Sequence, residues 1–462
     1  MSDQISRREF LARAGVGACL AAMGLPAFSA EEKRPNIVFI LTDDQRYDSM
    51  SCTGHPYVHT PNMDRLAKEG AIFRNAFVTT ALCSPSRGSF LTGKYVHTHG
   101  VTDNRTMFPT DTQATFPALL QKAGYETGYF GKWHMWRQDI KQPGFNRWVA
   151  LLGQGSYMDP KLNIDGTWTE NTGYVADILT RHAVDWLKQK RDAPFCMYLA
   201  HKSVHAPFTP AVRHSKLYEG AEIPLPPSAK DTMEGKPEVL RLKSPLAKGE
   251  NFPPNPEVFQ ERIRNYNRTL MGADDSVGRV LKALEEMGEL DNTIIIFAGD
   301  NGFFQGEHGL GDKRWAYEES VRIPFLVRFP KMLRAGSAID EMVLNIDLAP
   351  TLLDLAGAPI PPDMQGRSWK PLLQGKHPKW REDFLYEYFI DAEFPKAVPV
   401  IKGVRTARWK YITYPEINDV EELYDLKNDP AEMHNLAQNP KRADVLNDMK
   451  ARLARLLKET GA

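Results

Sequence analysis

The sequence lacks an excess of charge of either sign, and it is poor in cysteine. Its 462 residues carry 58 lysine and arginine side chains against 58 aspartate and glutamate side chains, so the formal net charge is zero. No overall field therefore favours nucleic acid or an anionic membrane as a partner, and any anionic ligand must be held by a local group of charges. Four cysteines in a chain of this length exclude a small disulfide-stapled scaffold.

The apolar run at the amino terminus, residues 12–28, is too short and too rich in glycine to favour a membrane span. Arg7-Arg8 precede it, and residues 27–29 offer a small-residue cleavage site. We interpret residues 1–30 as an export signal similar to the twin-arginine type, which predicts a periplasmic or extracellular protein without stable membrane insertion. The alternatives are an uncleaved membrane anchor and a lipoprotein signal at Cys19.

Removal of such a signal leaves the cysteines Cys52, Cys83 and Cys196. Three cysteines do not make a disulfide framework even in an oxidising compartment, so we predict no bridge. Cys196 lies in an apolar run and is predicted to be a core residue.

From residue 35 onward the pattern is that of an α/β protein. Continuous apolar runs at residues 36–41, 194–200 and 292–298 predict strands that are buried on both faces of a sheet. Because open α/β sheets place their sites at the carboxyl ends of strands, we expect the polar side chains that follow these runs to lie at one edge of the sheet. Those side chains are Asp43, Asp44, His205, Asp300 and Asn301.

Charged side chains after the predicted strands indicate particular chemistry. Burying the adjacent carboxylates Asp43 and Asp44 at the end of a strand costs free energy unless a cation or positive side chains compensate their charge. The alternative is a helix cap with a solvated neighbour. Lys132 and His134 follow a predicted strand at residues 125–130, and two residues apart on an extended chain they point to the same side. That arrangement suits a site that holds an anion and titrates a proton.

The rest of the chain contains helices, a long loop region and a carboxy-terminal segment with a different pattern of predicted strands. Residues 209–255 are polar and rich in proline, which predicts a long surface excursion of the kind that often forms substrate loops. After about residue 370, short strands and a final amphipathic helix predict a small antiparallel sheet with a closing helix. We therefore divide the chain into a signal at 1–30, an α/β domain at 35–370 and an α+β subdomain at 371–462. Other predicted elements are a strand at 73–80, a helix at 172–190, one long or two broken helices at 258–287, strands at 384–389, 403–408 and 409–414, and a helix at 443–458.

The segment from Cys83 to Tyr95 reads as a turn that opens a helix. Cys83 lies at the helix entrance and Arg87 lies one turn later on the same face. A thiolate or other anion is favoured at a helix N-terminus because free N–H groups and the helix dipole point there. The order Cys-x-Pro-Ser-Arg-x-x-x-Leu-Thr-Gly at residues 83–93 resembles the signature of the formylglycine-dependent sulfatases. The alternative is a core cysteine beside a surface arginine.

The resemblance covers residues 35 to 462 and implies an alkaline-phosphatase-like α/β sandwich, with a large, mostly parallel sheet and a smaller carboxy-terminal sheet domain. It implies that a maturation enzyme oxidises Cys83 to formylglycine, and that the aldehyde hydrate attacks the sulfur of a sulfate ester. It further implies a calcium ion, a hard cation that requires oxygen ligands. The implied ligands are Asp43, Asp44, Asp300, Asn301 and the formylglycine made from Cys83.

The same resemblance implies roles for the remaining site residues. Arg87 would hold the formylglycine hydroxyls, and His134 would lie beside the aldehyde hydrate. Lys132 and Lys313 would bind the sulfate oxygens, where a metal and cations must receive negative charge. His205 would protonate the leaving oxygen, because a poor alkoxide leaving group needs an acid.

Residues 312–318 and 153–155 look like the branch of the family that acts on sulfated amino sugars of glycosaminoglycans or mucins. The N-acetylglucosamine-6-sulfatases are the nearest comparison. One alternative is a phosphodiester or phosphonate monoester hydrolase with the same site, and another is a catalytically dead protein that binds sulfated glycans. Candidate sugar contacts are His99, Asp103, Asn104, Trp136, Gln154 and Arg314.

Overall fold

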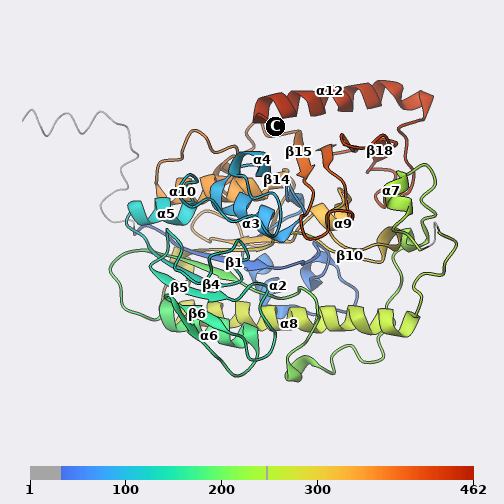
Figure 1. The fold of residues 1–462 in the computed structure, drawn as a ribbon. Helices are drawn as coiled ribbons and strands as arrows, with labels where there is room; N and C mark the ends of the chain where they lie inside the picture. The colour runs from blue at the N-terminus through green and yellow to red at the C-terminus, as the bar shows by residue number, and fades with distance from the viewer. Residues whose placement is uncertain (1–32, 246–247) are drawn as a thin grey trace, which may run out of the picture. The chain divides into compact units, whose positions relative to one another are not determined.

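The computed structural model describes residues 33–245 and 248–462, so the predicted export signal lies outside the described residues. Its largest element is a ten-stranded sheet in the order β13-β2-β12-β9-β1-β8-β4-β5-β6-β7 (Figure 1). The central strands β9, β1, β8, β4 and β5 run parallel, whereas β12, β6 and β7 are antiparallel to their neighbours. The strands are β1 (Asn36–Thr42), β2 (Ala71–Phe73), β4 (Glu126–Gly131), β5 (Arg147–Leu151), β6 (Leu162–Ile164), β7 (Thr167–Thr169), β8 (Phe195–Ala200), β9 (Thr293–Gly299), β12 (Phe325–Arg328) and β13 (Ser337–Ile339).

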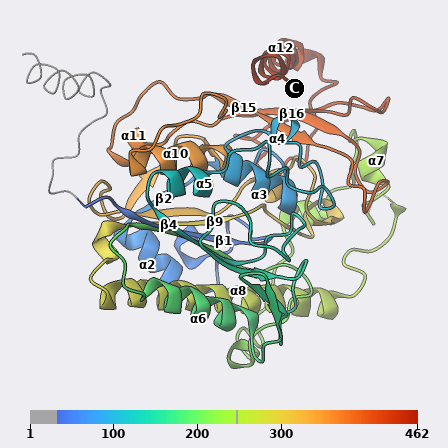
Figure 2. The ribbon, with the colours of Figure 1, turned by 60° about the vertical axis from the view of Figure 1, so that its left-hand side comes forward.

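The central strands are apolar throughout because helices cover both faces of the sheet. In β1, Ile37 and Phe39 pack into one core cluster while Val38 packs into the other, as the period of two along a strand requires. Figure 2 shows α3, α5 and α10 above the sheet and α2, α6 and α8 below it. These helices are α2 (Pro61–Glu69), α3 (Cys83–Thr92), α5 (Phe116–Lys122), α6 (Val175–Leu187), α8 (Pro256–Glu286) and α10 (Leu348–Ala356).

Helix α8 is a single helix rather than two broken ones. The Asn255 side chain caps it by accepting a hydrogen bond from the Val258 backbone N–H, and Pro256 occupies the first turn, where its missing N–H costs nothing. Its buried face lies against the sheet and α6, and this packing keeps the helix continuous over its whole length.

Two of the predicted segments differ from the structure. Residues 73–80 are not one strand, because the chain changes sheets at Arg74 and Asn75: β2 pairs with β12 and β13, whereas β3 (Ala76–Phe77) pairs with β14 (Val343–Leu344). The 209–255 segment is not only a surface excursion. Lys236 in this segment is buried and its ammonium donates to the Glu432 carbonyl oxygen at 2.5 Å, so the segment is anchored to the carboxy-terminal part of the chain.

The predicted carboxy-terminal sheet and closing helix are present. Strands β15 (Asp383–Tyr388), β16 (Ile401–Thr406), β17 (Trp409–Thr413) and β18 (Glu422–Asp425) form an antiparallel sheet, and α12 (Ala443–Thr460) packs on it through Met449, Leu453 and Leu456. Residues 35–462 form one compact unit, so the domain boundary near residue 370 stays a prediction.

Short elements complete the described chain: α4 (Val96–His99), α7 (Glu238–Arg241), α9 (Glu318–Val321), α11 (Lys370–Leu373), β10 (Phe304–Gln305) and β11 (Gly311–Asp312). No helix within residues 33–245 and 248–462 is both long and apolar enough to cross a membrane.

Candidate active site

The polar residues predicted at the strand ends do gather at one edge of the sheet. Asp43 and Asp44 follow β1, Lys132 follows β4, and Asp300 follows β9. Hydrogen bonds join these segments, because the Asp44 backbone N–H donates to Asp300 Oδ1 at 3.0 Å. The site is therefore assembled by the parallel strands, whose carboxyl ends all point to this edge.

Cys83 is the first residue of α3 and is completely buried. The residue before it has extended backbone, and Gly93 ends the helix in the left-handed conformation. The Cys83 Sγ atom lies 3.4 Å from Asp43 Oδ1 and 4.0 Å from Asp44 Oδ1. Burial and the Asp43 carboxylate raise the pKa of the thiol and so oppose the thiolate that a helix N-terminus favours.

Four acidic and sulfur ligands converge closely enough to hold a metal ion. One donor atom from each of Asp43, Asp44, Cys83 and Asp300 lies within 4.8 Å of the others, and all four residues are buried. Asn301 donates through Nδ2 to Asp44 Oδ1 at 2.8 Å, while its buried Oδ1 has no hydrogen-bond partner in the described part of the chain. An orphaned amide oxygen beside three carboxylates fits the ligand set of a hard cation.

Cationic side chains also compensate the carboxylates. Lys132 donates to Asp43, and Lys313 donates to both oxygens of Asp44 at 2.6 and 2.8 Å. Burial alone would raise the pKa of Asp43, but Lys132 and its other positive neighbours hold that pKa well below the usual value.

Arg87 bridges two of the strand ends. Its Nε donates to Asp300 Oδ2 at 2.9 Å and its Nη1 donates to the Lys132 carbonyl oxygen at 2.5 Å. Burial and the charge of Asp43 nevertheless raise the pKa of Asp300 to about 6, because three carboxylates share this small volume. Arg87, Lys132 and Lys313 match the three carboxylates in number.

His205 and His134 differ in the groups that their side chains contact. The Nδ1 atom of His205 lies 2.6 Å from the Ala206 carbonyl oxygen, and its Nε2 lies 3.9 Å from Asp44 Oδ2. The prediction that His134 lies on extended chain is wrong, because β4 ends at Gly131 and His134 has a φ of +60°. Its Nδ1 lies instead 3.2 Å from the Ser84 hydroxyl, at the entrance of α3.

Two of the candidate sugar-contacting side chains, His99 and Asp103, form hydrogen bonds within the protein. His99 is buried, its Nε2 lies 3.0 Å from the Ser89 hydroxyl, and its Nδ1 accepts a hydrogen bond from the Val101 N–H. Asp103 is also buried and accepts hydrogen bonds from the backbone and hydroxyl of Thr106. Both side chains hold the 99–106 loop, and their contact with a sugar stays a prediction.

The remaining candidates lie around the site and stay predictions. Asn104 Oδ1 accepts a hydrogen bond from the Ser84 backbone N–H at 3.1 Å, and Trp136 is 54% exposed. The Oε1 atom of Gln154 is buried without a hydrogen-bond partner among the described residues. Arg314 is bound to Asp312 and Asp391 and lines a cavity of about 270 Å³ together with Lys313.

Sequence reasoning missed Lys202, a second lysine at this edge. It is only 2% exposed, and its Nζ lies 4.9 Å from the centre of the Tyr157 ring. No carboxylate in residues 33–245 or 248–462 lies within ion-pair distance of it. Burial and the neighbouring Lys132 charge lower the pKa of Lys202 to about 8. Its position directly after β8, three residues before His205, is the signal that could have found it.

Comparison with known proteins identifies the family. The Sulfatase family model matches residues 35–358. The chain belongs to the sulfatase family. This sulfatase is thus a sulfuric ester hydrolase, and the family predicted from the Cys83 motif is confirmed. The family described as N-sulphoglucosamine sulphohydrolase, C-terminal, matches residues 306–459.

Individual relatives extend over nearly all of this sulfatase. It is 37% identical to the N-acetylglucosamine-6-O-sulfatase of Bacteroides thetaiotaomicron, over 96% of this chain and 89% of that protein. It is 31% identical to the human N-acetylglucosamine-6-sulfatase, over 92% of this chain and 84% of that protein.

Solved structures confirm the predicted fold class. An enzyme in complex with its substrate D-glucosamine-2-N,6-O-disulfate matches with a TM-score of 0.87 at 36% identity, covering 93% of this chain and 98% of the other. The phosphonate monoester hydrolase of Agrobacterium radiobacter shares the fold with a TM-score of 0.78 at 23% identity, over 92% of this chain and 96% of that one.

Proposed function

We propose that this sulfatase hydrolyses the 6-O-sulfate ester of a sulfated amino sugar, using a nucleophile made from Cys83 and a calcium ion bound beside it. The observation that carries the proposal is the convergence of Cys83 with Asp43, Asp44 and Asp300 within 4.8 Å in a buried site that cations surround. The relatives that act on N-acetylglucosamine-6-sulfate support the substrate class, because they match over most of the chain at more than 30% identity.

The nucleophile is proposed to be formylglycine, made from Cys83 by a maturation enzyme. The raised pKa of the thiol supports this, because an unmodified cysteine acts as a nucleophile through its thiolate. In the mature enzyme the Cys83 Sγ position would be taken by a hydroxyl of the aldehyde hydrate. Asp43 Oδ1, 3.4 Å from that position, lies where it would accept the proton of the attacking hydroxyl.

A bound calcium ion would supply positive charge against the sulfate oxygens. The chain's own part is to orient its ligands, with Asp43, Asp44 and Asp300 presenting carboxylate oxygens and Asn301 its unpaired Oδ1. Arg87 fixes the Asp300 carboxylate through two of its nitrogens, at 2.9 and 2.8 Å, and would hold the hydroxyls at position 83.

The lysines and histidines would handle the sulfate group and the proton. Lys132 and Lys313 would bind sulfate oxygens and stabilise the charge that develops on them in the transition state. His134, whose Nδ1 lies 3.2 Å from the Ser84 hydroxyl, would lie beside the aldehyde hydrate. Burial and Lys132 lower the pKa of His205 to about 4, so its imidazole is neutral at pH 7 before substrate binds. A bound sulfate ester raises that pKa, and Nε2 would then deliver a proton to the leaving oxygen.

The proposed activity is tested with mature enzyme and matched substrates. We expect kcat/KM for glucosamine 6-O-sulfate to exceed that for the same sugar sulfated at O3, and that for a phosphodiester, by at least about 10²-fold. Candidate contacts to the sugar are Asn104, Gln154 and Arg314. A preference for the phosphodiester would favour the phosphonate-type alternative, and tight binding of the sugar without turnover would favour a binding protein.

Lys202 is proposed to act as a third cation toward the sulfate group. A charge-assisted hydrogen bond contributes about 1.5–3 kcal/mol, so Lys202→Met is expected to lower kcat/KM and weaken inhibition by inorganic sulfate by about 10- to 10²-fold. The melting temperature should stay constant or rise, because burial of an unpaired ammonium is costly.

Two variants accompany the Lys202 experiment. Lys202→Arg retains the charge and is expected to restore part of the loss. Lys190→Met, at an exposed lysine after α6, is expected to leave kinetics unchanged. A Lys202→Met enzyme that melts earlier but keeps wild-type kinetics would assign Lys202 a purely structural role.

A further inference from the structure

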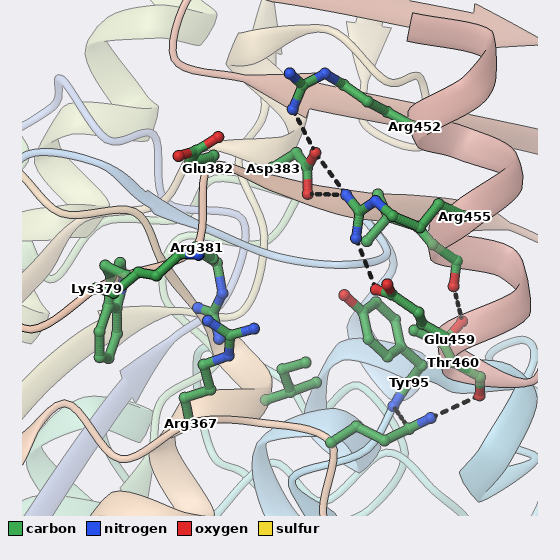
Figure 3. Close-up of a pocket in the computed structure, with 14 residues that line it drawn as sticks. Tyr95, Arg367, Lys379, Arg381, Glu382, Asp383, Arg452, Arg455, Glu459 and Thr460 are labelled. Atoms are coloured by element: carbon green, nitrogen blue, oxygen red, sulfur yellow. Dashed lines mark hydrogen bonds and ion pairs between the residues drawn. The ribbon is translucent and has the colours of Figure 1, made fainter. Parts of the chain in front are cut away.

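A second cavity lies away from the nucleophile, between residues 365–383 and helix α12. It has a volume of about 650 Å³ and is open to solvent (Figure 3). Tyr95, which lines it, follows the carboxyl end of α3, whereas Cys83 begins that helix. A helix of this length measures about 15 Å, so the two sites are separate.

The wall formed by α12 is internally neutralised. Arg452 donates to Asp383 at 2.9 Å, and Arg455 donates to both oxygens of Asp383 at 2.7 Å and to Glu459 at 2.6 Å. Figure 3 shows these pairs on one side of the cavity. They attach α12 to β15 and leave no surplus positive charge on that wall.

The opposite wall carries one arginine that is ion-paired and two cations that, within residues 33–245 and 248–462, are not. The Arg381 side chain is only 6% exposed and donates to both oxygens of Asp347, one of them at 2.7 Å. Arg367 and Lys379 are exposed, and no carboxylate in the described part of the chain lies within ion-pair distance of either. Asp347 is thus paired with Arg381, whereas Arg367 and Lys379 line the cavity without a carboxylate partner among the described residues. Glu382 also lines the cavity but lies apart from Arg367 in Figure 3.

Asp347 binds both the side chain of Arg381 and the backbone of Arg367. The same carboxylate that holds Arg381 accepts a hydrogen bond from the Arg367 backbone N–H at 2.7 Å. The preceding Gly366 passes so close to the backbone that an added Cβ would lie 1.9 Å from the Ile346 carbonyl oxygen, so the loop that carries Arg367 is tightly seated. The side chains of Arg367 and Arg381 both line the cavity, and in Figure 3 they extend toward one another. An anion bound between like charges reduces their mutual repulsion.

We propose that this cavity is an oxyanion site that binds a sulfate group between Arg367, Lys379 and Arg381. Guanidinium forks match the oxygens of sulfate and carboxylate groups, and the Tyr95 hydroxyl faces the same space in Figure 3. The sulfate group is carried either by a sulfated sugar chain or by free inorganic sulfate. The site depends on neither the nucleophile nor the proposed substrate, because it lies at the other end of α3.

The test measures binding by calorimetry to the full chain with Cys83→Ala, so that no ligand is consumed. A sulfated glucosamine oligosaccharide and inorganic sulfate are titrated in separate experiments with calcium present. The test variant is Arg367→Gln with Lys379→Gln. The control is Arg181→Gln with Lys190→Gln, which removes two exposed charges at α6, on the opposite face of the sheet. Thermal melting verifies that both proteins fold.

The expected result is one binding event fewer in the test variant than in the control, or an affinity at least about 10-fold weaker for that event. Loss of this event with the oligosaccharide alone identifies the glycan as the source of the sulfate group, and loss with both ligands shows that free sulfate suffices. Equal stoichiometry and affinity in the two proteins with both ligands would overturn the proposal. The result is the difference in binding between the test variant and the control. It therefore remains interpretable even when the active site binds neither ligand.

Discussion

Cys83→Ala is expected to abolish sulfate release, with a loss on the order of 10⁴-fold or more, because the substitution removes the thiol group that maturation would convert into the proposed nucleophile. The fold should persist. The side chain is small, and its removal from the buried start of α3 should cost about 1 kcal/mol of the free energy of unfolding. Sulfate release measured by ion chromatography, together with the melting temperature, checks both parts.

Cys196→Ala is the matched control for this experiment. Cys196 is also buried, but it lies within β8 and makes only core contacts. The Cys196→Ala enzyme should lose a similar small part of its free energy of unfolding and retain its rate of sulfate release. Substantial sulfate release by the Cys83→Ala enzyme, or a collapse of its melting temperature, would contradict a catalytic role for Cys83.

The mass of the peptide that contains Cys83 checks the modification directly. In protein from a host that makes formylglycine, this peptide is expected to be lighter by about 18 Da than the unmodified form, because the thiol becomes an aldehyde. An unmodified thiol in fully active enzyme would rule out formylglycine as the nucleophile. The same peptide from the Cys196→Ala protein should carry the same mass change.

Removal of calcium is expected to lower kcat/KM by about 10³-fold. Without the cation, the sulfate ester meets the carboxylates of Asp43, Asp44 and Asp300 with one positive group fewer. A charge at 4 Å in a partly polar site interacts by about 4 kcal/mol, which corresponds to about 10³-fold in rate. Chelation should also lower the melting temperature, because a ligand that binds only the folded state stabilises it. Activity assays and thermal melting, before and after addition of Ca²⁺, measure both effects.

Asp300→Asn provides the corresponding variant. It removes one carboxylate of the proposed calcium site and should weaken the response of activity to added Ca²⁺. Asp363→Asn is the control, because Asp363 is exposed and pairs only with Lys94. A chelated enzyme that retains its full rate, or an Asp300→Asn enzyme with an unchanged calcium response, would exclude a catalytic cation at this site.

The sequence by itself determined the features that depend on neighbouring residues or on strand periodicity. Continuous apolar runs predicted β1, β8 and β9, since a strand covered on both faces has no polar alternation. The Cys83 motif placed a helix N-terminus at the site. Asp43 and Asp300 are far apart in the chain, yet both follow apolar strands, and the rule that sites lie at the carboxyl ends of strands was enough to predict that they meet.

Only the tertiary structure decided the features that depend on contacts between residues distant in the sequence. No local pattern reveals that residues 73–80 change sheets, that His134 leaves the extended conformation, or that His99 is enclosed by the fold. Lys202 resembles a surface lysine in the sequence, and only the fold buries it and brings the Tyr157 ring close to its ammonium group. Asp347 and Arg381 likewise become one ion pair only after the chain has folded back on itself. Burial and pairing are properties of the folded chain, because they follow from which segments meet.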